Sequence, residues 1–141
     1  TSSTVSNGAT SDDNSVALTF TASEATSNFV VGDISVGGGS LSNFSTSSST
    51  VYTATFTPIF SGTKTITVAA NKFTDVAQNN NTAAQFNYTQ DRTSPTITLS
   101  SSDLTSRTYG STTDYYANTN SVLVTFTADE AITGFTSILF L

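Results

Sequence analysis

Carboxylates are the side chains of this sequence best suited to chemistry. The 141 residues include 10 Asp and Glu, 4 Lys and Arg, and no His or Cys. Without His and Cys, the commonest general base, the thiol nucleophile and the usual transition-metal ligands are all missing. Serines are plentiful, but no Gly-x-Ser-x-Gly turn precedes a helix. The acids are few and lie near predicted strand ends rather than paired across a cleft as in glycosidases. We expect no enzymatic activity.

The acidic residues could instead hold a hard cation, because Ca²⁺ prefers oxygen ligands. No EF-hand-like spacing fixes a ligand set, so solvated acids that keep the surface soluble are the alternative. Which acids could meet depends on the strands that carry them. The seven candidate ligands are Asp12, Asp13, Glu24, Asp75, Asp91, Asp129 and Glu130.

An internal repeat sets the organisation of the chain. Residues 14–29 read NSVALTFTASEATSNF and residues 120–135 read NSVLVTFTADEAITGF. Ten of the sixteen positions are identical at an offset of 106 residues, without a gap. One repeat therefore has about the size of an immunoglobulin-like domain, roughly 100 residues.

The repeat defines three segments. Residues 1–91 form an immunoglobulin-like unit that lacks its own first strand, because residue 1 corresponds to residue 107 within the second loop. Residues 92–95 form a linker, and residues 96–141 form the first strands of the next unit. The sequence has no initiator Met and no signal peptide, so we expect an internal piece of a longer precursor.

Alternation of apolar and polar residues predicts strands throughout. The inward positions fall in phase with the aromatic residues, which we therefore assign to the core. The 29 Thr and 23 Ser residues also favour sheet, since Thr is β-branched. The predicted strands lie around Ile97 and Leu99; Val16, Leu18 and Phe20, repeated as Val122, Val124 and Phe126; Phe29, Val31, Ile34 and Val36; Leu41 and Phe44; Tyr52, Ala54 and Phe56; Ile66 and Val68; and Phe86 and Tyr88. Seven short strands with frequent turns predict an all-β, Greek-key sandwich in tandem repeats.

This topology groups the acids at the ends of the sandwich, because loops alternate between its two ends. Asp12 and Asp13 lie at the end where the last strand exits at Asp91. The loop with Asp129 and Glu130 in the next unit would face that end, so these acids could converge on one calcium site. Glu24 and Asp75 share the opposite end, where they would need a preceding repeat to complete a site.

Net charge excludes some partners. The formal charge is −6 and no Lys/Arg cluster exists, so nucleic-acid binding is not expected. No run of about 18 apolar residues appears, so we expect no membrane insertion in this segment. Absence of Cys does not argue against export.

Several stretches together resemble the bacterial Ig-like repeats of large surface adhesins and secreted fibrous proteins. They are VALTFTASE (16–24), NFVVGDISV (28–36), GSLSNF (39–44), YTATFTP (52–58), DVAQNN (75–80) and DRTSPTITL (91–99). The resemblance implies an extracellular stalk or spacer role on the cell surface, neighbouring Ig-like repeats as partners, and calcium at repeat junctions. Where many relatives have Gly in an Asp-x-x-Gly-Asn turn, this chain has Gln78, and residues 137–141 also depart from the pattern.

Two other functions stay open. One is a self-assembling extracellular filament, in which a strand from a neighbouring chain fills the missing first-strand position of the first unit. The other is a carbohydrate- or receptor-binding module, for which Tyr109, Tyr115 and Tyr116 are the candidate exposed aromatics.

Overall fold

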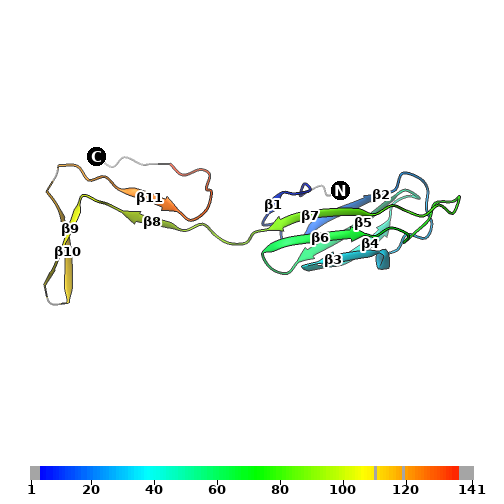
Figure 1. Ribbon diagram of the computed structural model, residues 1–141, viewed down its shortest axis with the longest axis horizontal. Helices are drawn as coiled ribbons and strands as arrows, with labels where there is room; N and C mark the ends of the chain where they lie inside the picture. The colour runs from blue at the N-terminus through cyan, green and yellow to red at the C-terminus, as the bar shows by residue number, and fades with distance from the viewer. Residues whose placement is uncertain (1–3, 110, 119, 137–141) are drawn as a thin grey trace. The chain divides into compact units, whose positions relative to one another are not determined.

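The computed structural model describes residues 4–109, 111–118 and 120–136. The chain divides into two compact units, Thr1–Thr93 and Ser94–Leu141 (Figure 1). Both are built from strands, and the one helical element of the described residues is the 3₁₀ turn η1 (Val31–Asp33). The prediction of an all-β, immunoglobulin-like fold is confirmed. No helix among the described residues is long and apolar enough to cross a membrane.

The first unit is a sandwich of two sheets. One sheet has the order β1 (Thr10–Ser11), β7 (Ala84–Gln90), β6 (Gly62–Val68) and β3 (Ile34–Gly37). The other has the order β2 (Val16–Thr21), β5 (Val51–Pro58) and β4 (Gly39–Thr46). All pairs are antiparallel except β1 with β7. Strands that neighbour each other in space are mostly not consecutive in the chain, as in a Greek key.

The core lies between these sheets and contains most of the predicted inward residues. Phe29 is its aromatic centre, with ring centroids of Phe20, Phe44, Tyr52 and Phe73 all within 5.8 Å. The buried hydrophobic residues are Val5, Val16, Leu18, Phe29, Ile34, Tyr52, Ala54, Phe56, Ile66, Val68 and Tyr88.

The predicted strand over residues 28–36 is wrong in its first half. Instead, the chain makes the turn η1, and the strand begins only at Ile34. The Asp33 carboxylate accepts a hydrogen bond from the Val30 N–H at 2.9 Å, and the Asp33 N–H donates to the Val30 carbonyl. This turn breaks the alternation, so Val31 is 48% exposed rather than inward.

The described residues of the second unit form two strand pairs. β8 (Ile97–Ser100) pairs antiparallel with β11 (Thr125–Ala128), and β9 (Leu104–Tyr109) forms a hairpin with β10 (Thr112–Ala117). The strand predicted from Val122 begins only at Thr125, and Val122 and Val124 are exposed. No facing sheet covers these residues within the described part of this unit. Residues 137–141, in the predicted partial unit, lie outside the described residues.

Candidate functional site

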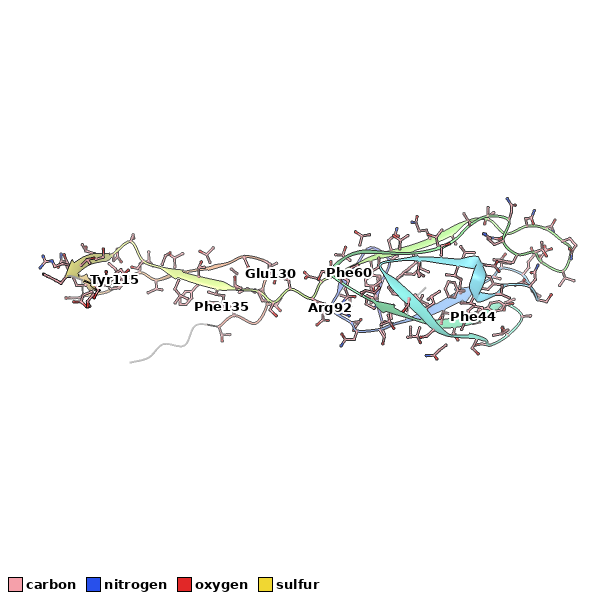
Figure 2. The ribbon with its side chains drawn as sticks, turned by 90° about the horizontal axis from the view of Figure 1, so that it is seen from below. Phe44, Phe60, Arg92, Tyr115, Glu130 and Phe135 are labelled. Carbon is pink, nitrogen blue, oxygen red and sulfur yellow. The ribbon has the colours of Figure 1, made fainter. Side chains whose placement is uncertain are left out.

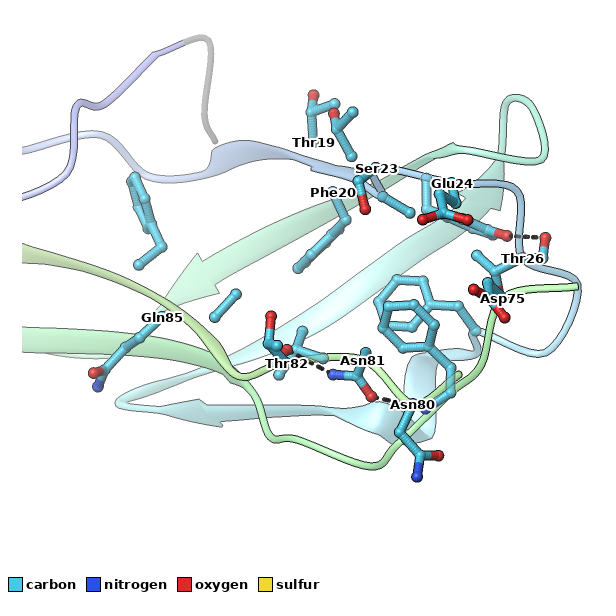
Figure 3. Close-up of a pocket in the computed structure, with 18 of the residues that line it drawn as sticks. Thr19, Phe20, Ser23, Glu24, Thr26, Asp75, Asn80, Asn81, Thr82 and Gln85 are labelled. Carbon is cyan, nitrogen blue, oxygen red and sulfur yellow. Dashed lines mark hydrogen bonds between the residues drawn. The ribbon is translucent and has the colours of Figure 1, made fainter. Parts of the chain in front are cut away.

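An apolar groove runs along β2 in the first unit. It encloses about 710 Å³ and opens between the edge of β2 and strand β7 of the facing sheet. Leu18 and Phe20 of β2, Ile66 and Val68 of β6, and Phe86 of β7 form its apolar lining. Figure 3 shows Phe20 directed into this space, with Gln85 and Thr82 along the opposite wall. The groove gives access to core side chains of the sandwich.

Asn81 fixes the loop that borders the groove. Its side-chain carbonyl accepts hydrogen bonds from the N–H groups of Lys72 and Phe73, at 2.7 and 3.0 Å. Its side-chain amide donates to the carbonyls of Ala69 and Thr82. The Asn81 side chain thereby connects the beginning of this loop, at Ala69, Lys72 and Phe73, with its end at Thr82. This connection holds Phe73 against the core.

Glu24 and Asp75 line one end of the groove, as Figure 3 shows. An isolated bridge between Thr26 and Asp75 brings their two loops together. Both oxygens of Asp75 are engaged within its own turn, however. They accept hydrogen bonds from the backbone N–H and the side-chain amide of Asn79, each at 2.8 Å. The side-chain amide and then the backbone N–H of Asn79 hold the pKa of Asp75 below its ordinary value of 3.8.

Asp12, Asp13 and Asp91 lie at the other end of the first unit. The parallel pairing of β1 with β7 aligns Ser11 with Gln90, so the residues that follow each strand are neighbours. The Asp91 N–H donates to the Ser11 carbonyl at 2.9 Å. Asp13 accepts a hydrogen bond from the Ser11 hydroxyl at 2.8 Å, and Asp91 accepts one from the Thr93 N–H.

Asp129 and Glu130 differ in how their oxygens are used. Asp129 accepts hydrogen bonds from the N–H and hydroxyl of Thr96, at 2.9 and 2.6 Å. The hydroxyl and then the N–H of Thr96 lower the pKa of Asp129. Glu130 Oε1, in contrast, is buried with no hydrogen-bond partner. The Asp129 carboxylate therefore fixes the start of β8 through Thr96, whereas Glu130 Oε1 has an unused lone pair that could accept a hydrogen bond.

These contacts divide the seven predicted metal ligands. Within either unit, the described residues include no group of three or more acidic side chains arranged around one metal position. Asp75 and Asp129 accept a hydrogen bond on each of their two oxygens, which leaves one lone pair per oxygen for a cation. Asp12, Asp13, Glu24, Asp91 and Glu130 each keep at least one oxygen that accepts no hydrogen bond from the described residues, which a cation could use. The convergence of Asp12, Asp13, Asp91 and Glu130 on one calcium ion stays a prediction.

Tyr109, Tyr115 and Tyr116, the candidate aromatics for ligand binding, do not form one continuous surface. They lie on the β9–β10 hairpin, in which Tyr115 pairs with Ser106 and Tyr116 with Thr105. Because side chains alternate between faces, Tyr115 projects opposite to Tyr116 and Tyr109, and it is 68% exposed (Figure 2). Arg107 lies over both Tyr109 and Tyr116, with its guanidinium 5.9 and 5.7 Å from the two ring centroids.

The sequence did not predict the groove as a site. Phe73 and Asn81, which line the groove, have no place in the alternating pattern, so the sequence carries no signal for them.

Comparison with known proteins agrees with the fold. A family model described as "Bacterial Ig-like domain" matches residues 1–90. No curated protein and no solved structure matches the chain.

Proposed function

Because the chain belongs to the bacterial Ig-like domain family, we propose that it is a structural spacer in the stalk of a cell-surface adhesin or fibre. The observation that carries this proposal is the family match over residues 1–90, followed by a second copy of the sequence of residues 14–29. Repeated sandwich units in series extend a chain by a fixed length per unit. The family is typically non-enzymatic, in keeping with a sequence without His or Cys.

Mechanical unfolding of single molecules tests the spacer role. Pulled through its two termini, the first unit should resist and then open in one step, because its core and both sheets form one cooperative body. Opening about 90 residues at roughly 3.6 Å per residue releases on the order of 30 nm of chain. Extension without a discrete step of about this length would contradict the proposal.

A surface location is tested separately. Antibodies raised against the folded chain should label intact cells of the bacterium that produces it, without permeabilisation. Labelling confined to permeabilised cells would contradict an extracellular stalk.

Calcium binding is a second part of the proposal. Asp12, Asp13 and Asp91 lie at one end of the first unit, where β1 pairs with β7. A cation bound there would neutralise the repulsion among these three carboxylates and stiffen the short segment that follows β7.

Thermal unfolding with excess Ca²⁺ and with chelator tests this part. A ligand at 100 times its Kd stabilises a fold by about 2.7 kcal/mol, which is a visible shift in midpoint. The shift should disappear in Asp91→Ala and persist in Asp114→Ala, a matched change in the hairpin. An unchanged midpoint would leave the spacer role standing and remove the calcium site.

A further inference from the structure

The turn that leads into β1 is bound to β7 through an Asn-Gly pair. The Ala9 N–H donates to the Ser6 carbonyl at 3.1 Å, which closes a turn with Asn7 and Gly8 at its centre. Gly8 has φ 83°, as a type II turn requires at its second central position. The Gly8 N–H donates to the Asn87 carbonyl at 2.7 Å, and the Asn7 side-chain oxygen accepts a hydrogen bond from the Asn87 N–H at 2.8 Å. One dipeptide therefore binds both polar groups of the Asn87 backbone.

These hydrogen bonds extend the pairing of β1 with β7. On β7, the Thr89 N–H donates to the Ala9 carbonyl at 2.9 Å. Alternate residues of a strand face the same neighbour, so the Asn87 N–H is the adjacent donor on this edge. Its acceptor is the side chain of Asn7 rather than a backbone carbonyl. Since β1 itself pairs over only two residues, the Asn7 side chain is a large part of what holds this segment on the sheet.

The same dipeptide is the one best suited to deamidation. Asn7 is the only Asn in the sequence that precedes Gly, and Gly has no side chain to hinder attack by its own nitrogen. The Gly8 nitrogen loses its proton and bonds to the side-chain carbonyl carbon of Asn7, and ammonia leaves, which closes a succinimide ring. Water then opens the ring. Addition at the main-chain carbonyl gives isoaspartate, whose backbone runs through the former side chain, and addition at the other carbonyl gives aspartate.

The closed turn opposes this reaction at both reacting groups. The proton that the Gly8 nitrogen must lose is donated to the Asn87 carbonyl, and the Asn7 oxygen is held by the Asn87 N–H. Ring closure requires the Asn7 side chain to fold back onto its own backbone, so both hydrogen bonds must open first. Asn7 and Gly8 are exposed to solvent, so water reaches the ring once it has formed.

The two products differ in whether the turn can close again. Aspartate at position 7 keeps an acceptor oxygen for the Asn87 N–H, because a carboxylate accepts hydrogen bonds. Isoaspartate lengthens the backbone by one methylene group and makes the accepting oxygen a main-chain carbonyl. The turn can then no longer present an acceptor to Asn87 in register with the pair of Ala9 and Thr89.

We propose that Asn7 is a site of spontaneous deamidation that the fold itself protects. While the turn is closed on β7 the reaction is blocked, and when the segment opens it proceeds to isoaspartate, after which β1 no longer docks in its original register. The modification is thus a one-way release of the first strand from the sheet, and its extent records how often this edge of the sandwich has opened. The inference goes beyond the spacer role and does not rest on it.

Peptide mapping of the full chain tests the protection. Samples are kept at one mildly alkaline pH, folded or unfolded in guanidinium chloride, and their digests are analysed by chromatography and mass spectrometry. Asn14, an exposed loop residue that precedes Ser15, is the comparison within the same chain. Unfolded, Asn7 should convert faster than Asn14. Folding should slow Asn7 at least about tenfold more than Asn14, because two hydrogen bonds must open first. Conversion of Asn7 at the same rate in both states would overturn the proposal.

Amide hydrogen exchange tests the release of β1. Chain with isoaspartate at position 7 is separated after conversion in the unfolded state, refolded, and compared with the parent and with Asn7→Asp. The Asn87 amide should exchange at least about tenfold faster in the isoaspartate chain, having lost its acceptor, and keep its protection in Asn7→Asp. Amides of β6, which has neighbours on both edges, report whether the sandwich has refolded. Unchanged protection of Asn87 in a refolded isoaspartate chain would overturn the one-way release. Equal loss in Asn7→Asp would overturn the role given to the lengthened backbone.

Discussion

At the scale of single residues, Gln78 stands out among the loops of the first unit. Three described non-glycine residues have positive φ, and two of them, Asn43 and Asn71, are of a type that tolerates this conformation. Gln78 has φ 71° without that tolerance. It occupies the turn position at which the family resemblance implies Gly. Gly suits this position because it adopts a positive φ without steric strain.

Replacement of Gln78 by Gly should therefore stabilise the first unit. Relief of the left-handed strain, about 1–2 kcal/mol, exceeds the added chain entropy of Gly, about 0.5–1 kcal/mol. We expect a net gain of about 0.5–1 kcal/mol in urea unfolding. Ala77→Gly is the control, because the φ of Ala77 is not positive, and it should destabilise the unit. A loss of stability in Gln78→Gly would contradict this expectation. It would mean that the Gln78 side chain stabilises the folded state by more than its left-handed backbone destabilises it.

Asp75 in the same turn should contribute a pH-dependent part of stability. The hydrogen bonds from Asn79 hold the pKa of Asp75 in the folded state below its ordinary value of 3.8. The unfolded chain therefore binds this proton first as pH falls, and the contribution is complete above pH 3.8. It is lost as pH falls through the lower folded-state pKa. Unfolding midpoints measured between neutral pH and pH 2.5 should fall less steeply in Asp75→Asn than in the parent chain. Parallel profiles would contradict this assignment.

At the scale of elements, regular alternation predicts the strands of the first unit correctly, whereas local irregularities do not show in the pattern. The inward sets of β2, β5 and β6 follow a strict period of two, and their residues are buried as predicted, except Phe20, which is partly buried. Leu41 and Phe44 are three residues apart, which strict alternation would put on opposite faces. A register shift between Ser42 and Ser45 adds one residue to β4 and lets both side chains pack against the core.

Other features depend on tertiary contacts that a local pattern does not contain. The pairing of β1 with β7 joins residues about 80 positions apart, and only two residues of β1 take part. Lys64 follows the inward phase of Ile66 and Val68 and is fully buried, although its charge would favour the surface. Likewise, the ends that carry the acidic residues could be predicted from topology, but the hydrogen bonds that occupy Asp75 and Asp129 could not.

Gly39 at the start of β4 gives a test of how closely β4 packs against β5. A Cβ atom there would lie 2.4 Å from the Phe56 ring and from the Thr57 carbonyl oxygen. Gly39→Ala should therefore force β4 away from β5 and cost about 1–3 kcal/mol, as overpacking in cores does. Gly32→Ala is the matched control, since a Cβ at Gly32 meets nothing within 4 Å, and chemical denaturation should show it near neutral. Equal stabilities of the two variants would contradict this packing.

At the scale of the whole molecule, the two units differ in how far their strands are buried. The first unit has two facing sheets around one core, and β5 and β6 each have neighbours on both edges. In the second unit, β8 is exposed along its whole length, and β9 with β10 forms an isolated hairpin. Two-stranded pairs without a packed face are marginally stable in water.

Amide hydrogen exchange on the full chain measures that contrast. At low concentration, amides of β5 and β6 should exchange slowly, because they open only when the first unit unfolds. Amides of β9 and β10 should exchange much faster, since their opening disrupts little buried surface. Protection in the second unit equal to that of the first would contradict this difference in stability between the two units.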